Sequence, residues 1–353
     1  MSFTPETLGP YLSNKLAKHC EIIEVEKFSR GSSRETWFIT YHAGAASEQV
    51  VFRCDPITGS VDYTPLAQEY FMYERMGHTK VPVARALWWE DDPALNGRPF
   101  YVRQHVGGNW NIAHYKDPSP EYDDLRIRIS KEHMSKLALV HAVDWKSLGL
   151  DKRLCTAPSR EQCTPHYIDA IAAAFEDLRI EPIPILLEAV EWLKAHAPVA
   201  PAICLCKGTN GLGEEVFRDE KIVAMCDWEE AQIGDPAADF AFMQNFAPDI
   251  VRDGKTLWGM QQAIDYYRSV GGADVTLASV RYYQIVRALR MLVFSHRVAG
   301  AVHRDAQTPI RHAWSAAEVV HLGKYILAAA MGMMPLSDLN YMTELNLSVE
   351  DIA

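Results

Sequence analysis

The sequence has few basic residues for its size. Its 35 lysines and arginines stand against 46 aspartates and glutamates, which gives a formal net charge of −11 over 353 residues. Nucleic acids and anionic membranes are bound by basic faces, so this charge argues against both as partners. The balance leaves room for a local basic pocket that binds one nucleotide. It is also compatible with a cationic substrate, although acidic proteins are common for solubility alone.

Targeting and membrane-spanning segments are also missing from the pattern. The first residues, MSFTPETLGPYLSNKLAKHC, contain no basic region followed by an apolar run, so no signal peptide is expected. No apolar run is as long as a bilayer span, because His321 and Lys324 interrupt the C-terminal stretch AAEVVHLGKYILAAAMGMM. We therefore expect a cytoplasmic protein whose C-terminal stretch is a packed amphipathic helix.

Cysteine pairs at zinc-site spacing are absent. The chain has seven cysteines, an odd number, and reduced thiols are the default for a cytoplasmic protein. Cys204 and Cys206 form a Cys-Leu-Cys motif, but no second pair stands at the distance that zinc sites need. The apolar flanks in AICLC favour a buried strand over a metal site.

The pattern that is present divides the chain into two parts. Residues 1–105 alternate between strand-like and helix-like segments, from a helix start at Thr4-Pro5-Glu6 to a hairpin around Asn96-Gly97. After Gly107-Gly108, helical periodicity dominates, apart from a short β-rich patch at 202–227. The sequence therefore predicts an α+β, bilobal, protein-kinase-like fold, with a β-rich lobe at 1–105 and a mainly helical lobe at 106–353.

A glycine- and serine-containing turn joins the first two predicted strands, in FSRGSSRETWFI. Backbone N–H groups around Gly31, Ser32 and Ser33 would come close to phosphate oxygens, and Arg30 and Arg34 add positive charge. An ordinary hairpin turn of Gly and Ser explains the same residues. The motif alone does not decide between the two.

Arg53 on a predicted strand is followed by Glu69 on the next predicted helix. A cation that faces an acid in this order fixes a side chain against nucleotide phosphates in kinase-like sites. Arginine offers a rigid, permanently charged fork for this purpose. The alternatives are a surface ion pair or no contact.

Three acids occur in CDWEEAQIGDPAADFAF. Asp227 ends an apolar strand, Asp235 lies in a Gly-Asp-Pro turn, and Asp239 begins a helix. Carboxylate oxygens at such a strand end are suitable ligands for Mg²⁺. This segment carries the strongest functional signal in the chain.

In this order the motifs resemble the aminoglycoside phosphotransferase and choline kinase-like superfamily, in the style of the kinase domain of acyl-CoA dehydrogenase fusion proteins. The segments that carry the resemblance are RGSSRETW, VVFR, QEYFMYERM, VPVARALWWEDDPALNGRPFYV, LALVHAVDW and CDWEEAQIGDPAADFAF. The resemblance implies an ATP- and Mg²⁺-dependent phosphotransferase that acts on a hydroxyl group of a small molecule, with the C-terminal helices around the acceptor. It implies that the nucleotide is contacted by Gly31, Ser32, Ser33, Arg53, Glu69 and the connection from Gln104 to Val106.

The resemblance also assigns roles in the second lobe. Asp227 would bind the metal, and Asp235 would brace the catalytic loop. The loop itself departs from the family, which usually has His-Gly-Asp followed five residues later by a metal-binding Asn. In LCKGTNGLGEEVF, Lys207 replaces the His, Thr209 the catalytic Asp, and Glu214 the Asn.

Three hypotheses follow from this departure. The protein remains a phosphotransferase in which Glu214, Glu215 or Asp235 supplies the base, and Glu214 keeps an oxygen ligand for the metal. Alternatively, Lys207, Thr209 and Glu214 perform different chemistry. In the third hypothesis the fold is a pseudokinase that binds or regulates. His141, in LVHAVDW, is expected to pack between helices.

Overall fold

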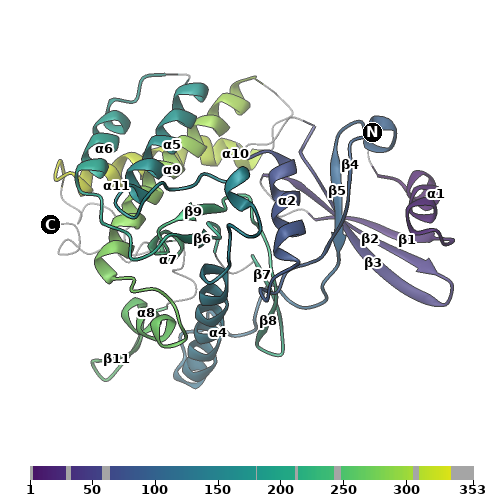
Figure 1. Cartoon of the computed structure of the whole chain (residues 1–353), viewed down its shortest axis with the longest axis horizontal. Helices are drawn as coiled ribbons and strands as arrows, with labels where there is room; N and C mark the ends of the chain where they lie inside the picture. The colour runs from purple at the N-terminus through teal and green to yellow at the C-terminus, as the bar shows by residue number, and fades with distance from the viewer. Residues whose placement is uncertain are drawn as a thin grey trace. The chain divides into compact units, whose positions relative to one another are not determined.

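Residue contacts divide the chain into two units, Met1–Gly107 and Gly108–Ala353. The computed structural model describes residues 3–28, 33–57, 64–179, 181–210, 214–241, 248–304 and 310–334. The first unit is built on an antiparallel sheet, and the second is mainly helical, as Figure 1 shows. The fold is therefore α+β, as the sequence predicts.

The first unit begins with a helix that its sequence caps. Thr4 is the N-cap, its side chain and that of Thr7 form a capping box, and Pro5 occupies the first helical position. The elements that follow one another are α1 (Pro5–Leu16), β1 (Glu21–Phe28), β2 (Glu35–Ala43), β3 (Ala46–Cys54), α2 (Leu66–Met76), β4 (Ala86–Glu90), α3 (Pro93–Asn96) and β5 (Phe100–Gln104). The strands lie in the order β1-β2-β3-β5-β4, and every neighbouring pair is antiparallel.

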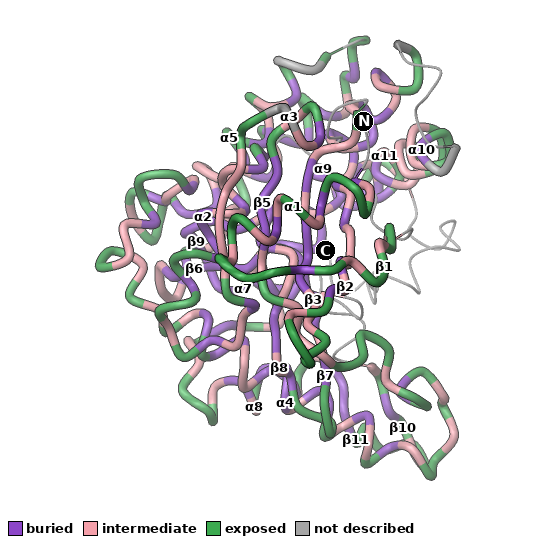
Figure 2. Tube along the Cα trace, turned by 90° about the vertical axis from the view of Figure 1, so that its right-hand side faces the viewer, coloured by how far each residue is buried: buried purple, intermediate pink, exposed green. Residues whose placement is uncertain are grey.

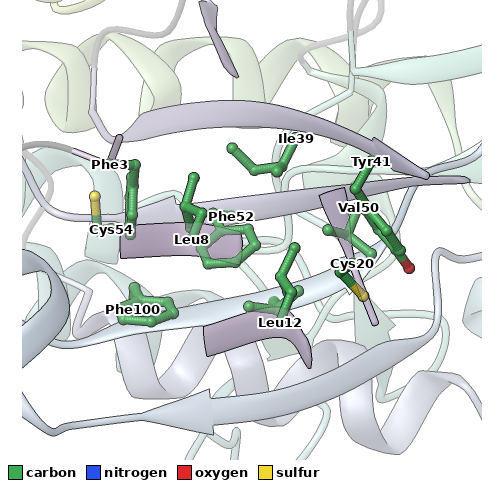
Figure 3. Close-up of a cluster of buried hydrophobic side chains, with 11 residues drawn as sticks. Phe3, Leu8, Leu12, Cys20, Ile39, Tyr41, Val50, Phe52, Cys54 and Phe100 are labelled. Carbon is green, nitrogen blue, oxygen red and sulfur yellow. The ribbon is translucent and has the colours of Figure 1, made fainter. Parts of the chain in front are cut away.

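One face of this sheet is covered by α1. Leu8 and Leu12 of the helix are fully buried in a cluster that includes Phe52 of β3 and Phe100 of β5 (Figure 3). The rings of Phe52 and Phe100 stack with their centroids 5.2 Å apart. Because successive side chains of a strand point to opposite faces, Arg53 lies on the face away from this cluster.

The second unit combines long helices with short strand pairs. Its elements are α4 (Asp123–His141), α5 (Cys163–Leu178), α6 (Pro184–Ala195), β6 (Cys204–Cys206), β7 (Glu215–Arg218), β8 (Lys221–Met225), β9 (Gln232–Gly234), α7 (Ala237–Phe240), β10 (Ile250–Arg252), β11 (Lys255–Trp258), α8 (Met260–Ser269), α9 (Leu277–Arg304), α10 (Ile310–Trp314) and α11 (Val320–Ala330), with short 3₁₀ turns at Pro120–Tyr122 and Leu150–Lys152 and a π-helical turn at Ser315–Val319. β6 pairs with β9 and β7 with β8, both antiparallel.

Glycine is required where the chain enters this unit. Gly108 has φ +155°, and a Cβ there would lie 2.5 Å from the carbonyl oxygen of Phe217. Asn109 and Phe217 then exchange two backbone hydrogen bonds of 2.8 Å. The second glycine of the Gly-Gly pair therefore fixes the chain against β7.

Two local predictions have clear outcomes. Cys204–Cys206 is a completely buried strand, as its apolar flanks indicate, and β6 and β9 are buried throughout (Figure 2). The prediction that residues after the β patch are mostly helical misses the β10–β11 hairpin, whose Val251 and Leu257 are exposed and give no alternating pattern.

Within the described part of the chain, no helix combines the length and hydropathy that a membrane span requires.

Candidate active site

Arg53 and Glu69 form the ion pair that the sequence predicts in the first unit. Arg53 Nη2 lies 2.9 Å from Glu69 Oε1, and Arg53 Nη1 donates a 2.9 Å hydrogen bond to Thr36 Oγ1. Thr36 stands opposite Arg53 in the β2–β3 register, so the sheet itself positions the guanidinium group. Glu69 is completely buried, which excludes the surface-pair alternative.

A second arginine binds the same carboxylate. Arg34 Nε lies 3.0 Å from Glu69 Oε2, and the Arg34 guanidinium also pairs with Asp55 and donates to the Thr64 carbonyl oxygen. Burial alone would raise the pKa of Glu69, but Arg53 and Arg34 outweigh it and hold the pKa below its usual range. Our sequence reasoning treated Arg34 only as loop charge. It lies two residues before Thr36, and the period of a strand places it on the same face.

The other nucleotide residues expected from the sequence stay predictions. Gly31 and Ser32 lie outside the described residues, and Ser33 stands at their edge. Gln104 ends β5 and donates its backbone N–H to the Arg85 carbonyl oxygen over 2.9 Å, while Val106 is half-buried just beyond the strand. Among the residues predicted to bind the nucleotide, Arg53 and Glu69 are in direct contact in the structure.

In the second unit, Asp239 holds the loop that follows β6. Its Oδ2 accepts a 2.8 Å hydrogen bond from the Lys207 N–H, and its Oδ1 accepts a 2.7 Å bond from the Gly208 N–H. Gly208 has φ +86°, and a Cβ there would lie 2.4 Å from the Glu230 carbonyl oxygen, so only glycine fits. Figure 1 shows β6, β9 and α7 grouped around this loop.

The bracing role predicted for Asp235 therefore belongs to Asp239. Asp235 Oδ1 instead accepts a 2.8 Å hydrogen bond from the Ala237 N–H at the start of α7. Four residues further on, Asp239 lies within α7 and is fully buried beside the end of β6. Burial raises the pKa of Asp235 to about 6.

His141 lies behind Asp239. Its Nε2 is 3.0 Å from Asp239 Oδ2, and its Nδ1 is 2.6 Å from the Tyr267 hydroxyl. His141, Cys204 and Cys206 bring three possible ligand atoms within 4.8 Å of one another. Both imidazole nitrogens already have partners, however, and the hydrogen bond from Cys204, together with burial, raises the pKa of Cys206 well above its usual value. These three residues therefore form a packing contact between the end of α4 and β6, as expected for His141.

Lys207 points into the protein. Its Nζ lies 3.5 Å from Glu215 Oε1, donates to the Thr209 carbonyl oxygen, and sits 5.9 Å from the Trp228 ring centroid. The same Glu215 oxygen is 3.4 Å from His133 Nε2, and Lys207, Glu215 and His133 are all fully buried. The Lys207 ammonium group is therefore engaged in an internal network.

Two polar side chains of the loop lack hydrogen-bond partners within the described residues. Thr209 is 7% exposed, and its Oγ1 atom is buried without a partner among these residues. The side-chain oxygen and nitrogen of the fully buried Asn210 also lack partners there. Buried polar groups are normally satisfied, so such atoms mark places where a bound molecule or water completes the structure. Asn210 was not among the residues singled out from the sequence.

Two carboxylate side chains, Glu214 and Asp227, lie together after this loop. Glu214 hydrogen-bonds with Asp227, which follows β8 with φ +63°, a conformation that non-glycine residues rarely adopt. Burial raises the pKa of Glu214, with Glu215 and Glu229 acting in the same direction and Lys207 and Asp227 opposing them. Two adjacent oxygen-ligand side chains fit a hard cation such as Mg²⁺.

These features define a kinase-like fold with a nucleotide-type ion pair and an acidic site beside a modified loop. Residues 24–281 match the phosphotransferase enzyme family, and the chain belongs to that family.

Solved structures support the same fold. A protein described as an aminoglycoside phosphotransferase from Ralstonia eutropha superposes with a TM-score of 0.66 at 19% identity, over 92% of this chain and 98% of that one. Macrolide 2′-phosphotransferase MphH from Brachybacterium faecium gives 0.57 at 18% identity, over 88% and 98%. Aminoglycoside phosphotransferase APH(4)-Ia, in a ternary complex with ADP and hygromycin B, gives 0.55 at 14% identity, over 91% and 98%. At these identities the likeness establishes the fold.

Curated relatives are longer proteins. Acyl-CoA dehydrogenase family member 10 of Mus musculus is 26% identical over 249 residues, which are 69% of this chain and 22% of the relative. Probable acyl-CoA dehydrogenase IBR3 of Arabidopsis thaliana is 25% identical over 232 residues, 62% of this chain and 27% of the relative. The chain thus spans about a quarter of the length of these relatives.

Proposed function

We propose that the protein uses Mg²⁺ and ATP to phosphorylate a hydroxyl group of a small metabolite. The observation that carries this proposal is the Glu214–Asp227 pair, which keeps two oxygen ligands together although the family's Asn has been replaced. A bound Mg²⁺ would neutralise the phosphates and the charge that develops on them during transfer. Asp227 and Glu214 would hold it.

Arg53 would contact the nucleotide phosphates. The carboxylate of Glu69 and the hydroxyl of Thr36 fix the guanidinium group, so little side-chain freedom is lost when an anion binds. Structural neighbours that have been captured with ADP or ATP, such as APH(4)-Ia and APH(2″)-IIa, support a nucleotide ligand.

Thr209 changes how the acceptor would be activated. A hydroxyl group does not accept a proton at neutral pH, and loss of general-base assistance typically costs about 10²- to 10⁴-fold in rate. Phosphoryl transfer depends chiefly on positioning and charge neutralisation, so the reaction survives this loss at a lower rate. The side-chain atoms of Thr209 and Asn210, which have no partner among the described residues, would orient the acceptor hydroxyl by hydrogen bonds.

The second candidate is a binding module without turnover. One observation favours it: the Lys207 ammonium group, at the position of the family's His, is buried against Glu215 and has a structural role. A loop whose replacement residues stabilise the fold instead of the reaction would serve binding alone.

The relatives suggest which acceptors to try first. Their names describe acyl-CoA dehydrogenases, whose substrates are acyl thioesters, so hydroxyl-bearing acyl thioesters and the corresponding free hydroxy acids form the first panel. Aminoglycosides and macrolides form the second panel, because the structural neighbours act on them.

The proposal is tested by calorimetric titration with Mg-ATP, followed by incubation with γ-labelled ATP and the acceptor panels. Arg53→Ala is expected to weaken Mg-ATP binding by about tenfold or more, because a charged hydrogen bond is lost. Arg128→Ala is the matched control, since Arg128 forms a bidentate pair with Glu220 on the surface of the second unit. Absence of Mg-ATP binding would refute the proposal, and binding without transfer would favour the binding module.

Thr209→Asp separates the two candidates further. If the rest of the site is arranged for transfer, restoring a carboxylate base is expected to increase ATP turnover by about 10²-fold or more. Thr209→Asn has nearly the same volume without the charge and serves as the control. Equal rates in both variants would contradict a site that is arranged for phosphoryl transfer.

A further inference from the structure

The loop after β6 also borders a cavity, whose wall includes Gly208. Its described lining residues all belong to the second unit. The cavity is open to solvent, and the space in it that a water-sized group can occupy is about 20 Å³. Its wall includes Gly208, Glu230, Gln232, Tyr167, Arg287 and Arg290. Such a space has room for a water molecule or one small terminal group of a ligand, and the rest of the ligand would lie outside it.

Two arginines and one glutamate form a fixed group at this wall. Arg287 Nη1 lies 2.9 Å from Glu230 Oε2, and Arg290 Nη2 lies 3.1 Å from Glu230 Oε1. The arginines stand three residues apart on α9, so they project from the same side of the helix. Burial would raise the pKa of Glu230, but Arg290 and Arg287 lower it to about 2, so the carboxylate is ionised at neutral pH.

The position of the group links it to the loop. Glu230 touches Gly208 through its backbone, since its carbonyl oxygen lies where a Cβ of residue 208 would be, and Thr209 follows directly. An acceptor bound at Thr209 would therefore lie one residue along the chain from the wall that Gly208 shares with Arg287 and Arg290. Guanidinium groups held in place by a carboxylate are pre-organised to bind an anion, because their planar donors match carboxylate and phosphate oxygens.

We propose that this cavity binds a carboxylate or phosphate group of the acceptor, with Arg287 and Arg290 as the residues that select an anionic substrate. The inference rests on the proposed function for the identity of the acceptor, while anion binding itself requires no turnover. Glu230 is the positioning residue that holds the two guanidinium groups. The chain has a formal net charge of −11, so an anion would be bound here by a local cationic group and not by the overall charge.

Three compounds of one carbon skeleton test the proposal: D-glycerate, sn-glycerol 3-phosphate and glycerol. Each is titrated by calorimetry into the full chain without nucleotide, at an ionic strength kept constant with sodium chloride. We expect at least one anion to bind and glycerol to bind much more weakly. A preference for glycerate identifies a carboxylate site, and a preference for glycerol 3-phosphate identifies a phosphate site.

Substitutions of the two arginines show whether their side chains bind the anion. Arg290→Gln and Arg287→Gln are each expected to weaken anion binding by about 10- to 100-fold, because each removes a charged hydrogen bond. The control is Arg128→Gln, which breaks an arginine–glutamate pair elsewhere in the second unit and should leave anion binding unchanged. If a single variant fails to fold, the triple variant Arg287→Gln, Arg290→Gln and Glu230→Gln replaces it, because it removes all three charges of the group together and should abolish anion binding.

The outcomes separate this inference from the proposed function. Equal binding of glycerol and the anions, failure of both anions to bind, or unchanged affinity in both arginine variants would overturn it. If the anions bind but labelled ATP transfers nothing, the anion site stands and the proposed phosphotransferase activity fails. If neutral and anionic alcohols are phosphorylated equally well, the activity stands and the anion site is refuted.

Discussion

Each unit contains a buried ionic network among its candidate residues. The central side chain is an acid in the first network and a cation in the second. In the first unit, the carboxylate of Glu69 lies between the guanidinium groups of Arg34 and Arg53. In the second unit, the ammonium group of Lys207 lies beside the carboxylate of Glu215. Both central side chains are fully buried.

The difference lies in what each network leaves accessible. The Arg53 side chain keeps 14% exposure, so the first network leaves part of a cation open to solvent. The Lys207 side chain has 0% exposure, and its nitrogen also donates to the Thr209 carbonyl oxygen. A charged residue of this loop is thus part of the buried scaffold that shapes it.

The largest effect is expected from Lys207→Met. This substitution leaves Glu215 as a buried carboxylate without its ammonium partner, and such a loss typically costs about 3–5 kcal/mol in free energy of unfolding. Chemical denaturation followed by circular dichroism measures the change. Lys207→Met combined with Glu215→Gln should recover much of the loss, since it removes both charges. An unaltered stability in the single variant would show that the pair does not support the fold.

A smaller loss is expected from Glu69→Gln. The amide keeps the shape and one acceptor oxygen but removes the charge shared by Arg34 and Arg53, so we expect a loss of about 2–3 kcal/mol. Mg-ATP affinity should fall in parallel, because Arg53 is no longer held in place. Glu74→Gln, on the exposed side of α2, is the control. If stability falls while Mg-ATP affinity does not, the pair is structural only.

Asp239→Asn is expected to act locally on the loop. The variant loses the charge that accepts hydrogen bonds from the backbone N–H groups of Lys207 and Gly208, at an expected cost of about 1–2 kcal/mol. Faster hydrogen exchange at these two amides is the direct measurement. Unchanged exchange at both would contradict the assignment of Asp239 as the residue that holds the loop.

The smallest effect concerns pH. The pKa of Asp235 is raised to about 6 in the folded chain, against 3.8 for the free carboxyl group. Below about pH 4 the group is protonated in both states, and as pH rises to about 6 the unfolded chain ionises first, so stability falls. Above about pH 6 the penalty is constant. Asp235→Asn should therefore remove this slope and raise the stability at neutral pH, because the amide has no charge to bury. Denaturant titrations at pH 4, 5, 6 and 7 compare the variant with the wild type, and parallel curves would contradict the prediction.

The sequence was sufficient to predict the main ion pair of the first unit. Arg53 on a strand and Glu69 on the next helix were paired correctly, because the order of elements and the strand period place them on facing surfaces. Arg34 was missed as a partner of Glu69, since a carboxylate with two oxygens accepts a second arginine whose position depends on the sheet register. The loop-bracing role predicted for Asp235 belongs to Asp239, because spacing alone does not tell which carboxylate of a turn and a short helix reaches the end of β6.

By itself, the sequence determined the α+β fold, the family and the Arg53–Glu69 pair, because these depend on residue type and local order. Only the tertiary structure decided that Lys207 points inward, that Asp239 holds the loop, and that Arg287 and Arg290 share Glu230 beside Gly208. Those contacts join segments far apart in the chain, and the direction of a buried charge depends on which partners the packed neighbours supply.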